Sequence, residues 1–412
     1  MNSADQLVQQ CFREYYNELR SPEFMPEEPQ RREYGFLLFK EKFMVRHRTF
    51  KAPEMVLQAI RELTPRHVYY STAYYSNPTA AMDEKGWSGA DLVFDIDADH
   101  LDTPCKKTHD KWKCKNCGKN GTGTAPKLCP ECKNERMDEE TWLCDQCLRQ
   151  AKEETHNLLE SLFSDIGSGI GLEPGDVRVF FSGHRGYHIH IVSKELSGIE
   201  EEGRREIVDY VLGTGFMPEV HLNVRQVSSR TNANIVGSAK IIEGPSAEEP
   251  GWRKKIVMGV YEDKDALKEE EKEGFLEKPK WSLLGVDKSK SAVAAAVNKW
   301  SAEIDTVVTT DVHRLIRLPG TLNGHTGLVA SRVPIEKLDE FDPFIDAISF
   351  NHKKTMKVYV NDAPAFKLGG NNLGPFHDET VELPKAAAIL LLCKHRADAN
   401  PPSKPPQTPG GG

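Results

Sequence analysis

The segment from Leu92 to Asp97 places the strongest constraint on the fold, because it reads Leu-Val-Phe-Asp-Ile-Asp and ends with two carboxylates two positions apart. Side chains alternate between the faces of a β-strand, so Asp95 and Asp97 should project from one face while Phe94 and Ile96 pack on the other. Two such close carboxylates repel unless a cation or proton lies between them, and hard oxygen ligands favour Mg²⁺ or Mn²⁺. The pair alone also fits a strand that ends in an acidic, solvated loop, and both interpretations are open at this point.

The composition predicts a soluble globular protein with one large or two medium domains, since the chain has 412 residues, 38% hydrophobic and 28% charged. No basic start followed by an apolar core marks a secretory signal. The longest apolar run, Ala386 to Cys393, is too short to cross a bilayer and is typical of a buried helix or strand. We therefore expect a cytoplasmic protein, in which the three Cys-x-x-Cys pairs bind metal rather than form disulfides.

The formal net charge of −8 is unevenly distributed along the chain. Basic residues gather in Lys40 to Lys51, in Arg253 to Lys255 and in Arg314 to Arg317, whereas Glu262 to Glu277 is acidic and has the spacing of an exposed helix. A local basic surface on an acidic protein can bind phosphates. Scattered, solvated charges are the alternative, which this pattern alone leaves open.

Helical and strand-like segments alternate along the chain, which indicates an α/β or α+β protein. A cysteine-rich insertion covers Cys105 to Cys147, Lys194 to Trp300 mixes helix-like and acidic sequence, and a disordered tail rich in Pro and Gly follows Asn400. Helices are expected over Gln6 to Leu19, over Pro53 to Leu63 and from near Cys147 to Leu162; strands are expected over Tyr34 to Phe39, Phe43 to Phe50, His67 to Thr72, Val177 to Phe181 and Tyr187 to Val192.

The cysteine pattern is the most specific metal signal in the sequence. Two Cys-x-x-Cys knuckles separated by a Gly-rich turn have the spacing of a zinc ribbon with four thiolate ligands: Cys114, Cys117, Cys129 and Cys132. The residues that bracket this ribbon could close a second zinc site of three sulfurs and one nitrogen: Cys105, His109, Cys144 and Cys147. Four protein ligands leave no open position for chemistry, so both sites should be structural.

A second cluster reads Ser182-Gly-His-Arg-Gly-Tyr-His188-Ile-His190 and predicts a turn between two strands. Its glycines would allow backbone N–H groups to approach a ligand, and Arg185 and His188 are donors suited to the oxygens of a triphosphate. On this segment alone, His188 and His190 could equally be metal ligands or ordinary hairpin residues.

A third cluster follows from Glu303 to Gly324, where Asp305 is expected on a strand ahead of a basic segment and a Gly-containing turn. A third carboxylate would complete a site for two metal ions, one activating a hydroxyl and one carrying phosphates. Asp311 is the other candidate for that third ligand.

Together these motifs resemble the small catalytic subunit of the archaeal and eukaryotic type of DNA primase. The resemblance rests on Arg32-Glu-Tyr-Gly-Phe36, Ala90 to His100, Ser182 to His188 and Arg314-Leu-Ile-Arg-Leu-Pro-Gly320. The Arg-Leu-Ile-Arg form and the zinc-rich insertion are more similar to archaeal members. The implied fold is a primase-type catalytic core of mixed sheets flanked by helices, with an inserted zinc-binding module and a helical insertion. The implied division is core over 1–104, zinc insertion over 105–147, core over 148–193, helical and acidic insertion over 194–300, core over 301–398 and tail over 399–412.

The resemblance also implies roles for individual residues. It assigns the catalytic metals to Asp95, Asp97 and Asp305, the incoming nucleotide to Ser182, Arg185 and His188, and a phosphate contact to Arg317. The chain departs from the family where Asn323 replaces a histidine that is frequent in the later turn, although His325 is near. The four-thiolate ribbon is a further departure from the family's smaller zinc knuckle.

The implied activity is template-directed synthesis of short RNA primers, or of DNA, on single-stranded DNA by two-metal nucleotidyl transfer. Implied partners are single-stranded DNA, nucleoside triphosphates and a larger primase subunit, and the implied setting is the DNA of an archaeal cell. The alternatives are a repair or damage-tolerant primase-polymerase of the same superfamily, and a noncatalytic zinc-ribbon protein that binds nucleic acid.

Overall fold

The computed structural model of the chain describes residues 2–20, 25–41, 43–167, 172–231, 234–351 and 354–401. These residues form two compact units. The first comprises Met1–Lys152, Val177–Glu200 and Val307–Gly412, and the second comprises Glu153–Asp176 and Glu201–Thr306. The second unit thus takes in residues 153–176 in addition to most of the expected helical insertion. Among the described residues, no helix has the length and apolar character needed to span a membrane.

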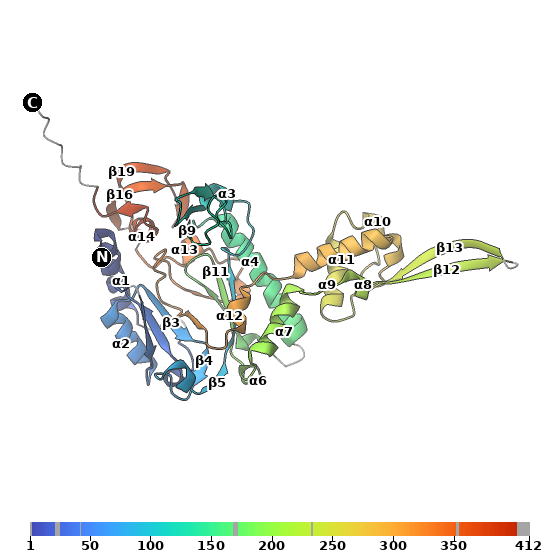
Figure 1. Ribbon diagram of the computed structural model, residues 1–412, viewed down its shortest axis with the longest axis horizontal. Helices are drawn as coiled ribbons and strands as arrows, with labels where there is room; N and C mark the ends of the chain where they lie inside the picture. Colours follow the sequence, from blue (N-terminus) through green and yellow to red (C-terminus); the bar gives the residue numbers. More distant parts are fainter. Residues whose placement is uncertain are drawn as a thin grey trace, which may run out of the picture. The chain divides into compact units, whose positions relative to one another are not determined.

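Two four-stranded sheets form the centre of the first unit (Figure 1). One has the order β15-β10-β11-β6, built from β6 (Leu92–Asp97), β10 (Val177–Phe181), β11 (Gly186–Ile191) and β15 (Arg332–Val333). The other has the order β14-β3-β1-β2, built from β1 (Tyr34–Leu37), β2 (Met44–Arg48), β3 (His67–Ser71) and β14 (Leu315–Arg317). All pairs in both sheets are antiparallel, which fits the α+β form of the expected fold.

Smaller elements surround these sheets. Other strands of the first unit are β4 (Ala73–Tyr75), β5 (Trp87–Ala90), β16 (Thr355–Ala363), β17 (Phe366–Leu368), β18 (Asn371–Leu373), β19 (Phe376–Pro384) and β20 (Ala397–Asp398). Its helices include α1 (Ser3–Glu18), α2 (Pro53–Leu63), α3 (Lys106–His109), α6 (Lys194–Ser197), α13 (Pro343–Asp346) and α14 (Lys385–Cys393). Helix α4 (Asp145–Glu160) and helix α12 (Thr306–Thr310) each belong partly to both units.

The helices of the first unit form where the sequence supplies a cap and an apolar face. Helix α1 begins after Asn2, whose side chain accepts a hydrogen bond from the backbone N–H of Asp5 at 2.7 Å. Its buried residues Val8, Phe12 and Tyr16 recur every four positions and so lie on one face. Figure 1 shows α1 beside α2, and the two helices contact each other. The apolar run at the end of the chain is helix α14, whose residues from Ala386 to Cys393 are all buried.

Helix α1 also supports the turn that follows β14. The hydroxyl of Tyr15 donates to the carbonyl oxygen of Gly320 at 2.9 Å, and the hydroxyl of Tyr16 accepts from the backbone N–H of Leu322 at 3.3 Å. A buried hydrogen bond between distant segments fixes both at a small net gain in stability. The N-terminal helix therefore holds a segment more than 300 residues away, as the separations of 305 and 306 residues show.

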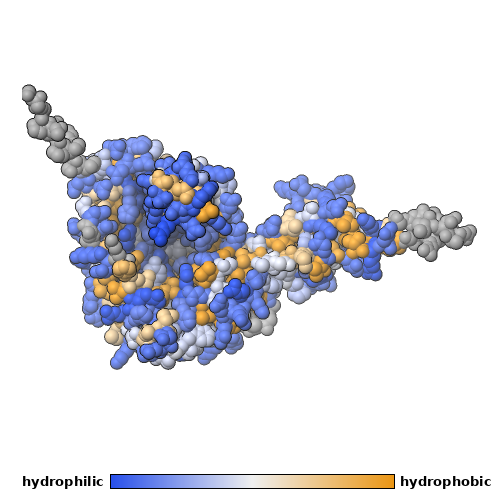
Figure 2. All heavy atoms as spheres, viewed as in Figure 1, coloured by the Kyte–Doolittle hydropathy of each residue, from blue (hydrophilic) through white to orange (hydrophobic). Residues whose placement is uncertain are grey.

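The cysteine-rich insertion forms a small three-stranded sheet of its own. It has the order β8-β7-β9, built from β7 (Lys111–Cys114), β8 (Asn120–Thr122) and β9 (Met137–Glu140). Gly121 on β8 lies directly beneath the ring of Trp112, where a Cβ atom would approach the indole to 2.6 Å. On the face shown in Figure 2, the surface around α3 and β9 is mostly hydrophilic with a small hydrophobic group. The buried hydrophobic residues within 105–147 are Cys114, Cys129, Trp142, Leu143 and Cys147, so cysteines make up most of the small core of the insertion.

The second unit is built from helices and one long hairpin. Its helices include α7 (Glu201–Leu212), α8 (Pro218–His221), α9 (Trp252–Glu262), α10 (Glu269–Lys272) and α11 (Val286–Trp300), and its hairpin pairs β12 (Asn223–Thr231) with β13 (Asn234–Glu243). Its apolar core gathers around Trp252, Ile256, Trp281 and Val293. This core has its own aromatic residues, so the unit can bury a hydrophobic interior independently.

Several expectations about local structure are corrected. The acidic segment Glu262 to Glu277 is not one exposed helix, because within it only the end of α9 and α10 are α-helical. Asp305 is not on a strand, since residues 301–305 are irregular and lead into α12. Both segments are short, and a short pattern of polar and apolar residues does not by itself distinguish helix, strand and coil. Lys42, in the basic segment Lys40 to Lys51, lies outside the described residues. Residues 402–412, in the expected disordered tail, also lie outside them.

Leu391 provides a test of the core around α14. Its side chain is fully buried, so we expect Leu391→Ala to lower the free energy of unfolding by about 2–5 kcal/mol through lost burial and a cavity. Met55 on α2 is 46% exposed, and Met55→Ala should cost about 0.5 kcal/mol. Urea unfolding followed by circular dichroism measures both. Equal losses for the two variants would contradict the placement of α14 in the core.

Candidate active site and metal centres

The two aspartates of β6 lie on the partly exposed face of their sheet, as the strand alternation predicts. Phe94 and Ile96 are fully buried, whereas Asp95 and Asp97 are partly exposed. Strand β11 pairs with β6 in a register that places His188 opposite Asp95 and Gly186 opposite Asp97. Directly opposed residues share one face of an antiparallel pair. The register therefore brings the second motif of the sequence against the first.

The turn between β10 and β11 requires glycine at two positions. Gly183 has a φ of +75°, a left-handed conformation that residues with a Cβ rarely adopt. At Gly186 a Cβ atom would overlap the carbonyl oxygen of Ile96 on β6. These glycines let the turn from Ser182 close tightly beside the aspartates, which is what a loop that approaches a phosphate needs.

A cavity of about 170 Å³ contains most of the residues expected from sequence. Its lining brings together Asp95, Asp97, Ser182, His188 and Arg317. The same cavity is also lined by Tyr69, His184, Val308, Arg314, Leu315, Ile316, Asn323 and His325. Carboxylates on one wall and cations on another give it the charge pattern of a site that holds a metal-bound polyphosphate.

His188 is neutral in this cavity. Burial, together with the positive charges of Arg317 and Arg314, lowers the pKa of His188 to about 3. Its Nε2 lies 3.5 Å from Oδ1 of Asp95. A neutral imidazole can donate one hydrogen bond without adding a charge that would compete with a metal at Asp95. His190 is fully buried, its Nδ1 pairs with the hydroxyl of Tyr70 at 3.1 Å, and it does not line the cavity of the aspartates.

Arg317 is held in place by two partners on β3. Its guanidinium donates to Nδ1 of His67 at 2.7 Å and to the hydroxyl of Tyr69 at 3.4 Å, and it also lies over the Tyr69 ring. Burial and the adjacent Arg317 charge hold the pKa of His67 well below its usual range, so His67 can accept this bond. The arginine is thus oriented before any ligand arrives, which lowers the entropy cost of binding a phosphate.

Asn323 takes a structural role in the later turn. Its buried side-chain amide donates to the carbonyl oxygen of Ser182 at 3.3 Å and so ties the turn after β14 to the loop of the second motif. His325 lines the same cavity, and burial with nearby arginines lowers its pKa to about 4. Position 323 is an asparagine in this chain, and the imidazole in this part of the cavity is supplied by His325.

Asp99 and His184 extend the cluster beyond the residues assigned from sequence. Ligand atoms of Asp97, Asp99 and His184 lie within 4.8 Å of one another. Burial and the adjacent Asp97 raise the pKa of Asp99 to about 6. Asp99 lies in the turn that follows β6, and its closeness to His184 depends on the pairing of β6 with β11.

Lys394 is a residue that the sequence did not single out. It follows α14, and its ammonium donates to Nε2 of His184 at 3.0 Å and to the carbonyl oxygen of Thr141 at 3.1 Å. Burial and the nearby Arg185 lower the pKa of Lys394 to about 8. A second cavity, of about 490 Å³, is lined by Lys394, His184, His325 and Asp99. No motif surrounds Lys394 in the sequence, so only the fold could reveal it.

Arg185 occupies a different position from its neighbours in the motif. Its side chain is fully buried, does not line the cavity of the aspartates, and pairs with Asp99 at 2.7 Å and with Asp110 at 3.2 Å. The structure therefore places its guanidinium inside the protein, on the side of the cysteine-rich insertion.

The two candidates for the third carboxylate belong to different units. Asp305 belongs to the second unit and directly precedes α12. Asp311 belongs to the first unit, and its carboxylate accepts a hydrogen bond from the backbone N–H of His313 at 2.9 Å. Asp311 does not line the cavity of the aspartates.

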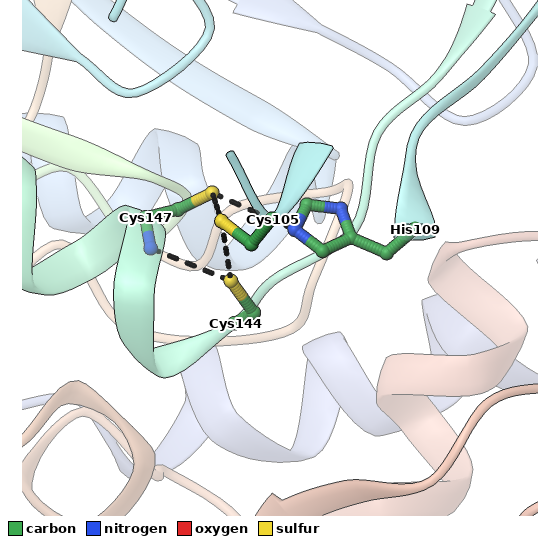
Figure 3. Close-up of side chains that lie close together, drawn as sticks. All are labelled: Cys105, His109, Cys144 and Cys147. Atoms are coloured by element: carbon green, nitrogen blue, oxygen red, sulfur yellow. Dashed lines mark hydrogen bonds between the residues drawn. The ribbon is translucent and has the colours of Figure 1, made fainter. Parts of the chain in front are cut away.

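The first cysteine cluster forms as expected (Figure 3). Ligand atoms of Cys105, His109, Cys144 and Cys147 lie within 4.8 Å of one another and point towards a common centre. His109 ends α3 and Cys105 directly precedes it, whereas Cys147 lies in the first turn of α4 and Cys144 directly precedes that helix. Nδ1 of His109 donates to Asp110 at 2.7 Å, which turns Nε2 towards the other three ligands, where it lies 3.7 Å from Sγ of Cys147. Three thiolates and one imidazole nitrogen are a common zinc ligand set.

The ribbon cysteines also come together. Ligand atoms of Cys114, Cys117, Cys129 and Cys132 lie within 4.8 Å of one another. Cys114 ends β7, and the other three lie in the turns around β8. A four-thiolate arrangement at this spacing suits a tetrahedral ion such as zinc.

Comparison with known proteins identifies the family. Carboxylates and a glycine-containing loop on one antiparallel sheet define a protein able to hold a divalent metal and a polyphosphate. Residues 137–335 match the family model described as DNA primase small subunit. The chain is 33% identical over 408 residues to the DNA primase small subunit PriS of Cenarchaeum symbiosum, covering 95% of this chain and 98% of the relative. It is 29% identical to the PriS of Nitrosopumilus maritimus, covering 96% and 99%, and 35% identical to that of Pyrobaculum calidifontis, covering 81% and 80%.

The chain therefore belongs to the DNA primase small subunit family. The resemblance drawn from the motifs is confirmed, and it extends over almost the whole chain.

The pKa of Lys394 provides a test of the larger cavity. Because this pKa lies near 8, raising the pH from 7 to 9 removes the ammonium charge, and we expect nucleotide affinity to fall about tenfold. Lys394→Gln has no charge to lose, so it should bind weakly at pH 7 and show a flat profile. Fluorescence titration with a labelled nucleotide and Mg²⁺ measures both, with the exposed Lys367→Gln as control. Parallel pH profiles for wild type and Lys394→Gln would refute a contribution of the Lys394 ammonium to nucleotide binding.

Proposed function

We propose that the chain is the catalytic small subunit of a DNA primase and makes short RNA primers, or DNA, on a single-stranded DNA template during replication. The observation that carries this proposal is the placement of Asp95 and Asp97 beside His188, Ser182 and Arg317 in one cavity. Family membership supplies the reaction class, nucleotidyl transfer. Because the relatives are archaeal proteins, we propose that the enzyme acts at DNA in the cytoplasm of an archaeal cell.

The residues of the cavity fit the chemistry of this reaction. Two Mg²⁺ or Mn²⁺ ions, held by Asp95, Asp97 and a third carboxylate, would lower the pKa of the attacking 3′-hydroxyl and neutralise the triphosphate. We propose Asp305 as the third ligand, because the family resemblance assigns it. The partly exposed carboxylates of β6 offer oxygen ligands on the open side of their sheet.

The cationic wall would bind the nucleotide. Arg317 presents a guanidinium whose fork matches phosphate oxygens, and His67 and Tyr69 keep it in position. Ser182 and neutral His188 add hydrogen bonds without adding charge. The arrangement orients a triphosphate relative to the aspartates, so most of the rate enhancement would come from positioning and electrostatic stabilisation.

The proposed partners follow from the same assignment. A template strand and nucleoside triphosphates are the substrates, and a larger primase subunit would form a heterodimer with this chain. We also propose that both cysteine clusters hold structural zinc, because their donor sets are closed and include no site for a substrate.

Substitution of the aspartates tests the catalytic assignment. Asp97→Asn should reduce primer synthesis at least about 10³-fold while leaving the fold intact, because it removes a metal ligand but relieves carboxylate repulsion. Asp95→Asn should behave in the same way, and Asp305→Asn should be far more damaging than Asp311→Asn. The assay combines purified chain, single-stranded DNA, labelled nucleotides and Mg²⁺ or Mn²⁺, with circular dichroism as the control for folding.

The presence or absence of a primer separates the related functions. Synthesis from unprimed template supports a primase, whereas extension of a pre-made primer without initiation would favour a repair polymerase. Activity within a few fold of wild type in Asp97→Asn would reject the metal assignment, and absence of synthesis and of nucleotide binding in the wild type would favour a noncatalytic protein.

Zinc content tests the two cysteine clusters. Elemental analysis after exhaustive dialysis should find two zinc ions per chain, one for each group of four ligands. Cys105→Ser and Cys117→Ser should each remove one ion, while Cys11→Ser should remove none because Cys11 is buried on α1 away from both groups. A single zinc that Cys105→Ser leaves unchanged would eliminate the site shown in Figure 3.

A further inference from the structure

Arg185 connects the loop of the candidate active site to the cysteine cluster of Cys105, His109, Cys144 and Cys147. One guanidinium nitrogen of Arg185 pairs with Asp99 at 2.7 Å and with Asp110 at 3.2 Å. The other donates to Sγ of Cys147 at 3.4 Å. Because the side chains of Arg185 and Asp110 are both buried, water screens the contact between them very little, whereas the side chain of Asp99 is 36% exposed. The arginine thus contacts a cluster ligand directly.

Asp110 is the residue in which these contacts converge. Its carboxylate accepts from Nδ1 of His109 at 2.7 Å, from the backbone N–H of Trp142 at 2.9 Å, and from Arg185. The first bond fixes the His109 tautomer, so that Nε2 faces the cluster. One buried carboxylate therefore orients a cluster ligand and anchors the arginine of the loop at the same time.

The backbone of Arg185 connects its buried side chain to the strand of the aspartates. Its carbonyl oxygen accepts from the N–H of Ala98 at 3.1 Å, immediately after β6, and the next residue, Gly186, lies opposite Asp97. The turn itself is closed by the N–H of Ser182, which donates to the carbonyl oxygen of Gly186 at 2.9 Å. A shift of the buried guanidinium would therefore move the loop relative to Asp97.

We propose that Asp110 is a positioning residue that couples the Cys105, His109, Cys144 and Cys147 cluster to nucleotide binding through Arg185. This proposal rests on the proposed function, because it assigns nucleotide binding to the loop from Ser182 to His188. The cluster then does more than stabilise the cysteine-rich insertion, because its geometry also determines the position of the loop from Ser182 to His188.

Charge explains why the coupling needs both residues. A zinc ion held by three thiolates and one neutral imidazole would carry a net charge of −1, and the carboxylates of Asp99 and Asp110 lie around the same guanidinium. Arg185 is the cation that contacts Cys147, Asp99 and Asp110 together. A buried cation in this position offsets their repulsion, and removal of one partner leaves the others without compensation.

Asp110→Asn tests the coupling with little change of size. In zinc-saturated buffer, we expect the variant to bind ATP with Mg²⁺ about tenfold more weakly by calorimetry, and to raise the nucleotide KM by a similar factor. Its kcat at saturating nucleotide should stay within about threefold of wild type, because the aspartates of β6 are unchanged. Zinc content is measured in the same samples. Asp102→Asn, at an exposed position of the same region, is the matched control and should leave KM unchanged.

A nucleotide affinity and KM within twofold of wild type in Asp110→Asn would overturn the proposal. So would a fall in kcat alone, since this is what partial unfolding produces. If the wild type binds nucleotide but makes no primer, the proposed function fails while the binding experiment still decides the coupling.

A double substitution distinguishes coupling from two separate effects. Arg185→Lys keeps the charge but cannot contact Asp99, Asp110 and Cys147 together, so it should weaken nucleotide binding about as much as Asp110→Asn does. If both act through one contact, the double variant should lose no more affinity than the worse single variant. Losses that multiply would show that Asp110 does not act through Arg185.

Discussion

The antiparallel pairing of β6 with β11 is the interaction on which the rest of the site depends. It places His188 opposite Asp95 and Gly186 opposite Asp97, and so joins two motifs that are almost 90 residues apart in the sequence. A slip of one residue would turn the aspartates to the buried face of the sheet. The buried Phe94 and Ile96 oppose such a slip, because it would expose them to water. The hydrophobic core therefore determines the register, and the register determines the chemistry.

The sequence predicted those parts of the structure that depend on periodic pattern or on ligand spacing. Strand alternation correctly oriented Asp95 and Asp97. Cys-x-x-Cys spacing, together with the position of Cys105 and His109 beside the ribbon, correctly predicted the two groups of four candidate metal ligands. Helix α2 and strand β10 also have the expected bounds, because Pro53 and the turn after Phe181 mark their ends clearly. These features are local or nearly local, so a single sequence contains enough information to predict them.

The sequence could not predict features that arise from the meeting of distant segments. Lys394 lies in no motif, yet the fold brings its ammonium to His184. Arg185 has the chemistry of a phosphate ligand and stands in a phosphate-binding loop, but its guanidinium points into the protein towards Asp110. Residue type restricts what a side chain can do, whereas its direction depends on neighbours that a sequence pattern does not contain. Asp305 was placed on a strand for a similar reason, since two polar-apolar alternations are too few to exclude irregular structure.

The tight approach of Gly186 to Ile96 has a consequence for how such a protein can change over generations. The spacing between the loop and the aspartates is set here by main-chain atoms in contact, with no side chain between them that could be made longer or shorter. Point substitutions therefore have almost no means of adjusting this spacing in small steps. Insertions outside the sheet of β6 and β11 can change the protein more easily, because they leave this spacing unaltered. The cysteine ribbon of β7, β8 and β9, which forms a separate sheet, is such an insertion.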